Sequence, residues 1–153
     1  MSYVKSVLQP DEQVRYTTNI HWIIYLPGLG VLILAGLAYW LALREVAAAS
    51  LWIAIAIVLA IIAALMLLSA WFRRFITEIA VTNRRIIYKR GFISRSTIEM
   101  QMDKVESVDV EQSIVGRIFG YGDIVIRGVG VGIEPLKNID SPIEFRNHVT
   151  GER

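Results

Sequence analysis

The sequence predicts an α+β membrane protein, in which a two-helix transmembrane hairpin precedes a small bent antiparallel β-sheet or open barrel closed by a C-terminal helix. Two observations lead to this fold class. Residues 22–43 and 46–72 are two apolar runs without a formal charge, and both exceed the roughly 20 residues that a helix needs to cross a bilayer. After Arg73 the pattern changes to short alternating segments with frequent glycine, which is typical of strands.

The composition limits the chemistry that the chain can perform. Of its 153 residues 54% are hydrophobic, above the roughly 45–50% of soluble domains. The absence of cysteine excludes disulfides, thiolate chemistry and cysteine-ligated metals. We predict a cytoplasmic N-terminal segment (1–19), a hairpin (20–72, with spans at about 22–43 and 50–72) and a cytoplasmic domain (73–153) large enough for one small core.

The first 19 residues are polar and mixed, and they lack the pattern of a signal peptide. A turn is expected at residues 10–12 and a strand at residues 13–18, with Val14 and Tyr16 on one face. We expect this segment to lie against the C-terminal domain. A mobile leader is the alternative.

Aromatic side chains lie near the ends of both apolar runs, as in the interfacial belts of membrane helices. They are Trp22, Tyr25, Tyr39, Trp40, Trp52 and Trp71. Two buried helices of a soluble core would need apolar partners that this chain lacks. The pair Pro27-Gly28 is expected to kink the first span.

Basic residues predict the orientation of the hairpin. Arg44 is the only one between the spans, whereas the segment after the second span is rich in arginine and lysine. By the positive-inside rule both ends of the hairpin are cytoplasmic, with a short external turn at residues 44–50. Neither span has an ionisable side chain in its middle, which argues against a pore or transporter.

Three alanines recur every four residues in the second span and form a candidate helix-packing face. They are Ala56, Ala60 and Ala64. Such a face permits close helix approach, either within the hairpin or between copies of the chain.

The C-terminal half predicts several antiparallel strands. Residues 75–81 and 84–92 alternate on either side of the turn Thr82-Asn83 and form a hairpin. Further strands are expected at residues 94–102, 104–112, 122–131 and 132–139. The stagger at Ser107 indicates a bulge.

Two helices are expected among these strands. Ser113 caps a short helical turn over residues 114–119, which ends at Gly120. Ser141-Pro142 begins the closing helix, with Glu144 placed for a capping box. Phe145, His148 and Val149 share the inner face of that helix.

Three segments in this order carry a family resemblance: TNRRIIYKRGF, IEMQMDKVESVDVEQSIVGRIFGYGDIVIRG and NIDSPIEFRNHV. Together they resemble the bacterial pleckstrin-homology-like (bPH2-type) membrane proteins, and the two upstream spans fit the family's common layout. The resemblance implies a bent sheet closed by a C-terminal helix. It also implies membrane attachment in a bacterium and a binding or scaffolding role without catalysis.

The candidate site is a set of basic residues at the membrane surface, where each cation near an anionic leaflet contributes about 1 kcal/mol. Lipid-binding PH domains use basic residues in the first two strands and their loop, similar ground to Arg84, Arg85, Lys89 and Arg90. The spacing departs from the usual phosphoinositide pattern. The alternative is a topology signal plus a solvated strand face. The full set is Arg73, Arg74, Arg84, Arg85, Lys89, Arg90 and Arg95.

Other chemistry is disfavoured by the sequence. From residue 75 onward 11 basic residues balance 11 acidic ones, which argues against nucleic acid as a partner. The glycine run at 128–132 lacks the helix of a dinucleotide loop. A run of carboxylates reads as a solvated strand face rather than a metal site: Glu99, Asp103, Glu106, Asp109 and Glu111. His21 is expected at the membrane interface, and no catalytic residue, cofactor or metal is predicted.

We therefore expect an integral protein of the bacterial cytoplasmic (inner) membrane, multi-pass, with both termini cytoplasmic. Its domain is expected to contact anionic lipid headgroups or protein partners without catalysing a reaction. The alternative is a structural protein that forms homo-oligomers through its spans and domains.

Overall fold

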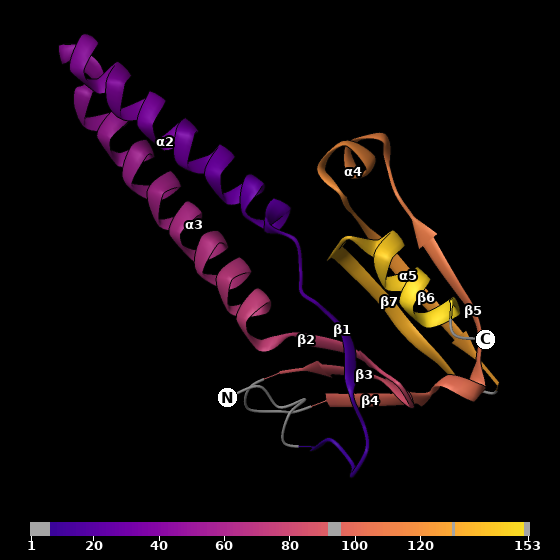
Figure 1. Cartoon of the computed structure of the whole chain (residues 1–153). Coiled ribbons are helices and arrows are strands. Elements are labelled where there is room, and N and C mark those ends of the chain that lie inside the picture. Colours follow the sequence, from indigo (N-terminus) through magenta and orange to yellow (C-terminus); the bar gives the residue numbers. More distant parts are fainter. Residues whose placement is uncertain (1–6, 92–95, 130, 152–153) are drawn as a thin grey trace. The chain divides into compact units, whose positions relative to one another are not determined.

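The computed structural model describes residues 7–91, 96–129 and 131–151. The chain divides into two compact units (Figure 1). The helical unit is Trp22–Arg73, and the sheet unit combines Met1–His21 with Arg74–Arg153. The N-terminal segment therefore belongs to the same unit as the C-terminal half of the chain.

The helical unit contains two long apolar helices. A 3-10 turn, η1 (Trp22–Tyr25), leads into α2 (Leu26–Arg44), and a second, η2 (Val46–Ala48), leads into α3 (Ala49–Ile76). Both helices are long and apolar enough to cross a membrane, judged by length and composition. Fewer than a quarter of the residues in each apolar window are buried within the protein, unlike the core helices of soluble domains.

Two expectations about these helices are wrong. Pro27 lies in the first turn of α2, where its missing N–H removes no helical hydrogen bond, so it begins the helix and does not kink it. The second helix runs to Ile76 and includes Phe75, both expected in a strand. No glycine or proline follows residue 72 within α3, so nothing in the sequence ends the helix before the alternating pattern begins at Phe75.

The residues that the two helices bury are glycine and alanine, but they do not follow the four-residue repeat of alanines in α3. Of the three alanines in that repeat Ala56 is buried, whereas Ala60 and Ala64 are exposed. A four-residue step turns a helix by about 40° beyond a full circle, whereas a seven-residue step falls short of two full turns by only about 20°. A seven-residue spacing relates Ala56, Ala63 and Ala70, the buried residues of α3. In α2 it relates Gly28, Ala35 and Ala42, and Ala38 is buried between the last two.

The sheet unit contains two antiparallel sheets (Figure 1). The first has the order β1 (Val14–Thr18), β2 (Glu78–Thr82), β3 (Arg85–Arg90) and β4 (Ser96–Gln101). The second has the order β5 (Val105–Glu111), β6 (Tyr121–Gly128) and β7 (Val131–Asp140). The turn η3 (Met102–Lys104) joins the sheets, and the helix α4 (Ile114–Phe119) joins β5 to β6.

Local details of the strands follow the sequence pattern. The strand β1 pairs with β2, which attaches residues 14–18 to the C-terminal half. The β5–β6 register shifts between Val105 and Ser107, where the bulge was expected. The helix α4 begins at the Ser113 cap and ends at Gly120, whose φ of 76° is left-handed.

The closing helix α5 (Pro142–Thr150) covers the core, but its first turn differs from the expectation. Phe145 and Val149 are buried among the apolar side chains of both sheets. Ser141 has a φ of 48° and its side chain makes no capping bond. Glu144 instead accepts a hydrogen bond from the Tyr16 hydroxyl at 3.3 Å. His148 is exposed rather than on the inner face, and its ring stacks on Tyr16 at 4.6 Å.

Candidate functional site

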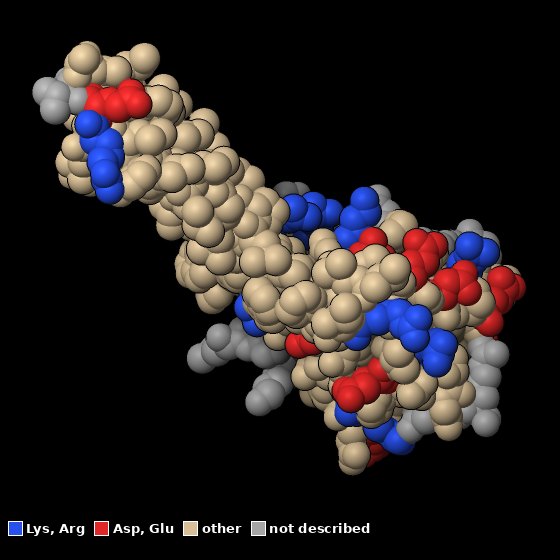
Figure 2. Space-filling model, turned by 90° about the horizontal axis from the view of Figure 1, so that it is seen from above, with Lys and Arg blue, Asp and Glu red and all other residues tan. Residues whose placement is uncertain are grey.

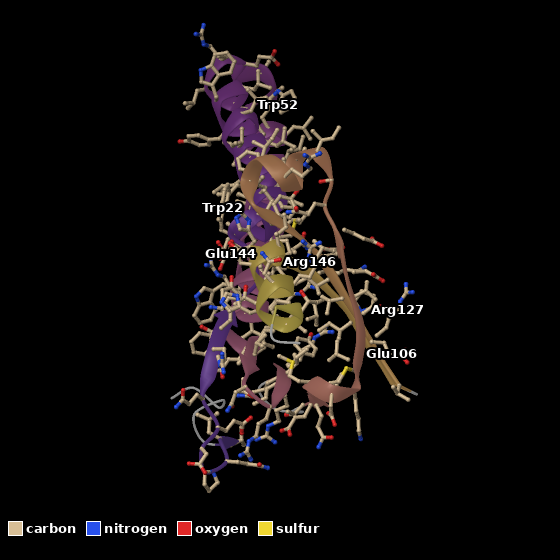
Figure 3. The ribbon with its side chains drawn as sticks, turned by 45° about the vertical axis from the view of Figure 1, so that its right-hand side comes forward. Trp22, Trp52, Glu106, Arg127, Glu144 and Arg146 are labelled. Atoms are coloured by element: carbon tan, nitrogen blue, oxygen red, sulfur yellow. The ribbon has the colours of Figure 1, made fainter. Side chains whose placement is uncertain are left out.

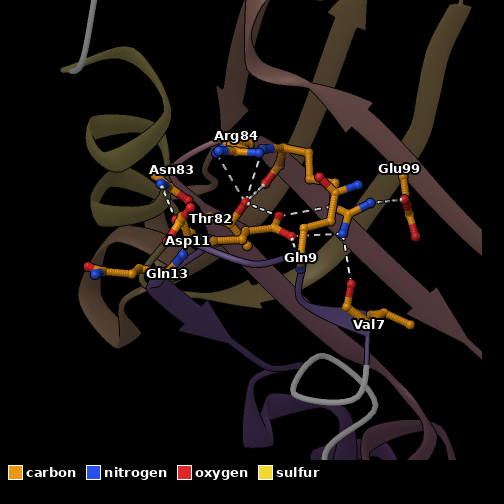
Figure 4. Close-up of polar contacts among 10 residues, drawn as sticks. Val7, Gln9, Asp11, Gln13, Thr82, Asn83, Arg84 and Glu99 are labelled. Carbon is orange, nitrogen blue, oxygen red and sulfur yellow. Dashed lines mark hydrogen bonds and ion pairs between the residues drawn. The ribbon is translucent and has the colours of Figure 1, made fainter.

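Arg85, one of the basic residues expected at the lipid surface, is committed to contacts inside the sheet unit. Figure 4 shows the surrounding network of polar contacts, in which Val7, Thr82 and Glu99 are labelled. Its Nε and Nη2 donate to the two carboxylate oxygens of Glu12 at 2.9 and 2.8 Å. Its Nη1 donates to Glu99 at 2.7 Å, and Nη2 also donates to the Val7 carbonyl at 2.9 Å. The side chain of Arg85 is only 15% exposed, and that of Glu12 is fully buried.

Glu12 is held ionised by this arrangement. Burial is the largest influence on the pKa of Glu12 and raises it, but the donors around the carboxylate together outweigh burial. These are Arg85, the Gln9 N–H at 2.9 Å and the Thr82 hydroxyl at 2.7 Å, and the positive charge of Arg85 acts with them. The pKa of Glu12 therefore lies below its ordinary value, and the bond from Glu12 raises that of Arg85. Arg85 thus joins the N-terminal segment to the first sheet, which corrects its expected role at the lipid surface.

The remaining basic residues do not converge on one pocket. Arg84 is exposed in the β2–β3 turn, just before β3 begins, whereas Lys89 and Arg90 are the last two residues of β3. At about 3.3 Å per residue, these positions are roughly 20 Å apart. Arg73 and Arg74 are exposed near the end of α3, and Arg95 lies outside the described residues. The set therefore divides into groups with different surroundings.

One end of the first sheet carries both chain connections to the helical unit. Thr18, the last residue of β1, pairs with Ile79, and Glu78, the first residue of β2, pairs with Lys89. Glu78 follows the end of α3 by two residues, and Thr18 precedes η1 by four. Lys89 and Arg90 thus lie at the helix-connected end of this sheet, and Arg84 lies at the other end.

The second sheet has its own helix-connected end, marked by His21. The N–H of His21 donates to the Asn138 carbonyl at 2.7 Å, and its ring stacks on Tyr121 at 5.3 Å. The Thr18 hydroxyl donates to the Asp140 carbonyl at 2.8 Å, which ties the same end to β1. His21 is buried in these contacts, whereas the sequence suggested a place at the membrane interface.

The helix α4 projects from that end of the second sheet, beyond the ends of β5 and β6 (Figure 1). Its residue buried against the sheet is Gly116, where a Cβ would lie 2.6 Å from the Tyr121 carbonyl oxygen. Its four large apolar side chains are exposed: Ile114, Val115, Ile118 and Phe119. Sequence reasoning treated this segment only as a turn. The signal that it missed is the use of glycine on the inner face of an otherwise apolar helix.

The acidic residues lie mostly at the surface. On the face in Figure 2, acidic and basic side chains are scattered over the sheet unit, whereas those visible on the helical unit are gathered at its tip. Figure 3 shows Glu106 and Arg127 pointing outward from β5 and β6, and Arg127 forms an exposed ion pair with Asp109 at 3.4 Å. Within the part of the chain that the structure describes, no three histidine, aspartate or glutamate side chains gather as metal ligands would.

An open cavity of about 380 Å³ lies at the Arg84 end of the sheet unit. Its charged lining residues are Arg85, Glu99 and Lys104. Arg85 and Glu99 are already paired with each other. This cavity therefore offers little unpaired charge for recognising a charged ligand.

Comparison with known families agrees with this architecture. A family model described as a bacterial PH domain matches residues 22–153, which include both apolar helices and every strand except β1. The chain therefore belongs to the bacterial PH domain family, as its motifs indicated. Domains of this kind are PH-like and typically non-catalytic. No curated protein and no solved structure matches the chain.

Proposed function

We propose that this chain is an integral membrane protein that presents its PH-like domain at the cytoplasmic face of the bilayer, where the domain contacts anionic lipid headgroups. In this proposal the protein lies in the inner membrane of a bacterium and does not catalyse a reaction. The observation that carries it is the grouping of Lys89 and Arg90 at the end of the first sheet that is connected to both apolar helices.

The lengths of the helices support this placement. At 1.5 Å per residue, α2 is about 28 Å long and α3 about 42 Å, against a hydrocarbon core of about 30 Å. The extra turns of α3 extend beyond the core and carry Arg73 and Arg74 at the level of the headgroups. The segment after α3 is rich in basic residues, whereas the turn between the helices has Arg44 alone. By the positive-inside rule this difference favours a cytoplasmic location for the end of α3.

Chain connectivity limits how far the sheet can lie from the lipid. Glu78 is four residues after Arg74, a distance of at most about 14 Å in an extended chain. Lys89 pairs with Glu78, so it remains near the headgroups whenever Arg74 does. Arg84 is at the far end of β3, and Arg85 is excluded by its contacts with Glu12.

Lipid contact is tested on the full chain in nanodiscs of neutral or mixed neutral and anionic lipid. Native mass spectrometry would count the anionic lipids retained by each variant. The double variant Lys89→Ala/Arg90→Ala is expected to retain fewer than the parent, because two cations near the surface are lost. Arg84→Ala is the matched control and is expected to retain the parental number. Equal retention by all three proteins would contradict a headgroup contact at this end.

Self-association is the second candidate function, and one observation favours it. Ala60 and Ala64 are exposed on α3, so this part of the four-residue repeat is open to another helix in lipid. Replacement of Ala60 by leucine is then expected to convert an oligomer to a smaller particle. A strictly monomeric parent in nanodiscs and mild detergent would exclude this candidate.

A further inference from the structure

We infer that α4 is a membrane-inserting tip, whose apolar side chains enter the boundary between the headgroups and the acyl chains. This inference rests on the proposed membrane location of the helices, but not on the anionic contact of Lys89 and Arg90. The partner is the lipid bilayer itself.

The exposed apolar surface of α4 is a fixed feature of the fold. The Ser113 hydroxyl accepts a hydrogen bond from the Gly116 N–H at 3.0 Å, and Gly120 ends the helix. The Gln112 side chain donates to the Tyr121 carbonyl at 2.9 Å, which holds the helix to the start of β6. With Gly116 facing the sheet, the apolar side chains project outward, and Ile114 and Ile118 are 79% and 74% exposed.

The position of α4 in the sheet unit selects lipid as its partner. Tyr121 directly follows the residue that ends α4, and the ring of Tyr121 stacks on His21. Trp22 follows His21, and α2 begins four residues later, about 8 Å along a 3-10 turn. The base of α4 is therefore connected to the bilayer-crossing α2 through the Tyr121–His21 stack and the four residues of η1.

The composition of α4 also suits a bilayer surface. Isoleucine, valine and phenylalanine supply apolar contact, and the exposed Arg117 is placed among them. Arginine at such a site extends its charged group to the phosphates while its methylene stem stays with the apolar chains. Amphipathic helices that lie in the interface bury their apolar face about 5–10 Å into the headgroup and acyl boundary.

The absence of cysteine permits a direct depth measurement with single-cysteine variants of the full chain. Ile118→Cys and Ile114→Cys report on α4, and both side chains are exposed, so the fold should tolerate the label. Val129→Cys is the control, since it is 68% exposed at the β6–β7 turn, away from α4. Each variant would carry bimane in vesicles of neutral phosphatidylcholine, with nitroxide on the acyl chains or iodide in the water as quencher.

We expect acyl-chain nitroxide to quench the labels at 118 and 114 severalfold more than the label at 129, and iodide to show the reverse order. The inference is overturned if iodide quenches all three labels equally. It is also overturned if the labels at 118 and 114 are shielded from both quenchers, because a protein surface then covers α4.

A label at Thr97, which pairs with Lys89, separates failure of this inference from failure of the proposed function and leaves both cations in place. Insertion of α4 is driven by apolar contact and should persist in neutral lipid, whereas the contact of Lys89 and Arg90 should depend on anionic lipid. A label at 97 that lies near the surface of anionic vesicles, with aqueous labels at 118 and 114, would overturn the inference alone. Release of the whole chain from vesicles at alkaline pH would overturn the membrane location itself.

Discussion

Replacing Arg85 with alanine should destabilise the sheet unit while leaving the helical unit unchanged. Among the residues that the structure describes, four hydrogen bonds reach the buried Glu12 carboxylate. The substitution removes the two from Arg85 and leaves those from the Thr82 hydroxyl and the Gln9 N–H. Breaking a buried ion pair on one side costs about 3–5 kcal/mol, because the remaining charge loses its partner. Since about 1.4 kcal/mol corresponds to a tenfold change, opening of the unit should become at least about 100-fold more favourable.

Amide hydrogen exchange of the full chain in nanodiscs measures this opening, through the protected amides of β2 and β3. Arg84→Ala is the control, since the neighbouring side chain is exposed and surface substitutions usually change stability by less than about 0.5 kcal/mol. The double variant Glu12→Gln/Arg85→Met should recover most of the loss, because it removes both buried charges. Exchange rates in Arg85→Ala that match the parent would refute the structural role assigned to this residue.

The same pair gives a pH dependence of defined sign. The pKa of Glu12 in the folded chain is lower than the ordinary value of 4.5. Glu12 therefore contributes to folding stability above pH 4.5, and this contribution is lost as the pH falls through the folded pKa. In Arg85→Ala burial is no longer outweighed, so the pKa of Glu12 should rise. The stability gap between the parent and this variant should therefore narrow between pH 7 and pH 4. A gap independent of pH would contradict a charged Glu12.

Three further substitutions test the packing of the two units. Gly28→Ile should separate the helices of the hairpin at a cost of about 1–3 kcal/mol, since even a Cβ at this position would lie 2.8 Å from Leu67. Gly36→Ala is the control and should be neutral, because a Cβ there meets no atom within 4 Å. Fluorescence transfer between labelled helices, during titration with a denaturing detergent, measures both variants. Phe145→Ala should cost the sheet unit about 3–5 kcal/mol, because the ring is fully buried, and hydrogen exchange of α5 measures it. Gly116→Ala should displace α4 from its strand, and exchange in β6 reports the change.

Much of the sheet unit could be predicted because its signals are local. The Ser113 cap, the glycine at 120 and the bulge at Ser107 each depend on residues a few positions apart. The end of α3 could not be predicted in this way. Phe75 and Ile76 suit a strand as well as a helix, and an intact preceding helix decides between them.

The candidate site was harder to predict because it depends on distant partners. Arg85 resembles its neighbour Arg84 in sequence, yet it is paired with Glu12, which lies 73 positions earlier. No periodicity in the chain indicates that pairing. The helix-connected ends of the sheets likewise depend on strand register, which places Lys89 beside Glu78 and His21 beside Tyr121.

The central claim is that both apolar helices cross a bilayer and leave the PH-like domain in the cytoplasm. Single cysteines at Ala47, in the turn between the helices, and at Arg84, in the sheet unit, test it without background labelling. A membrane-impermeant maleimide should label Ala47→Cys in intact cells once the outer membrane is permeable, and Arg84→Cys only after the inner membrane is opened. Labelling of both positions from the same side of the inner membrane would contradict the account.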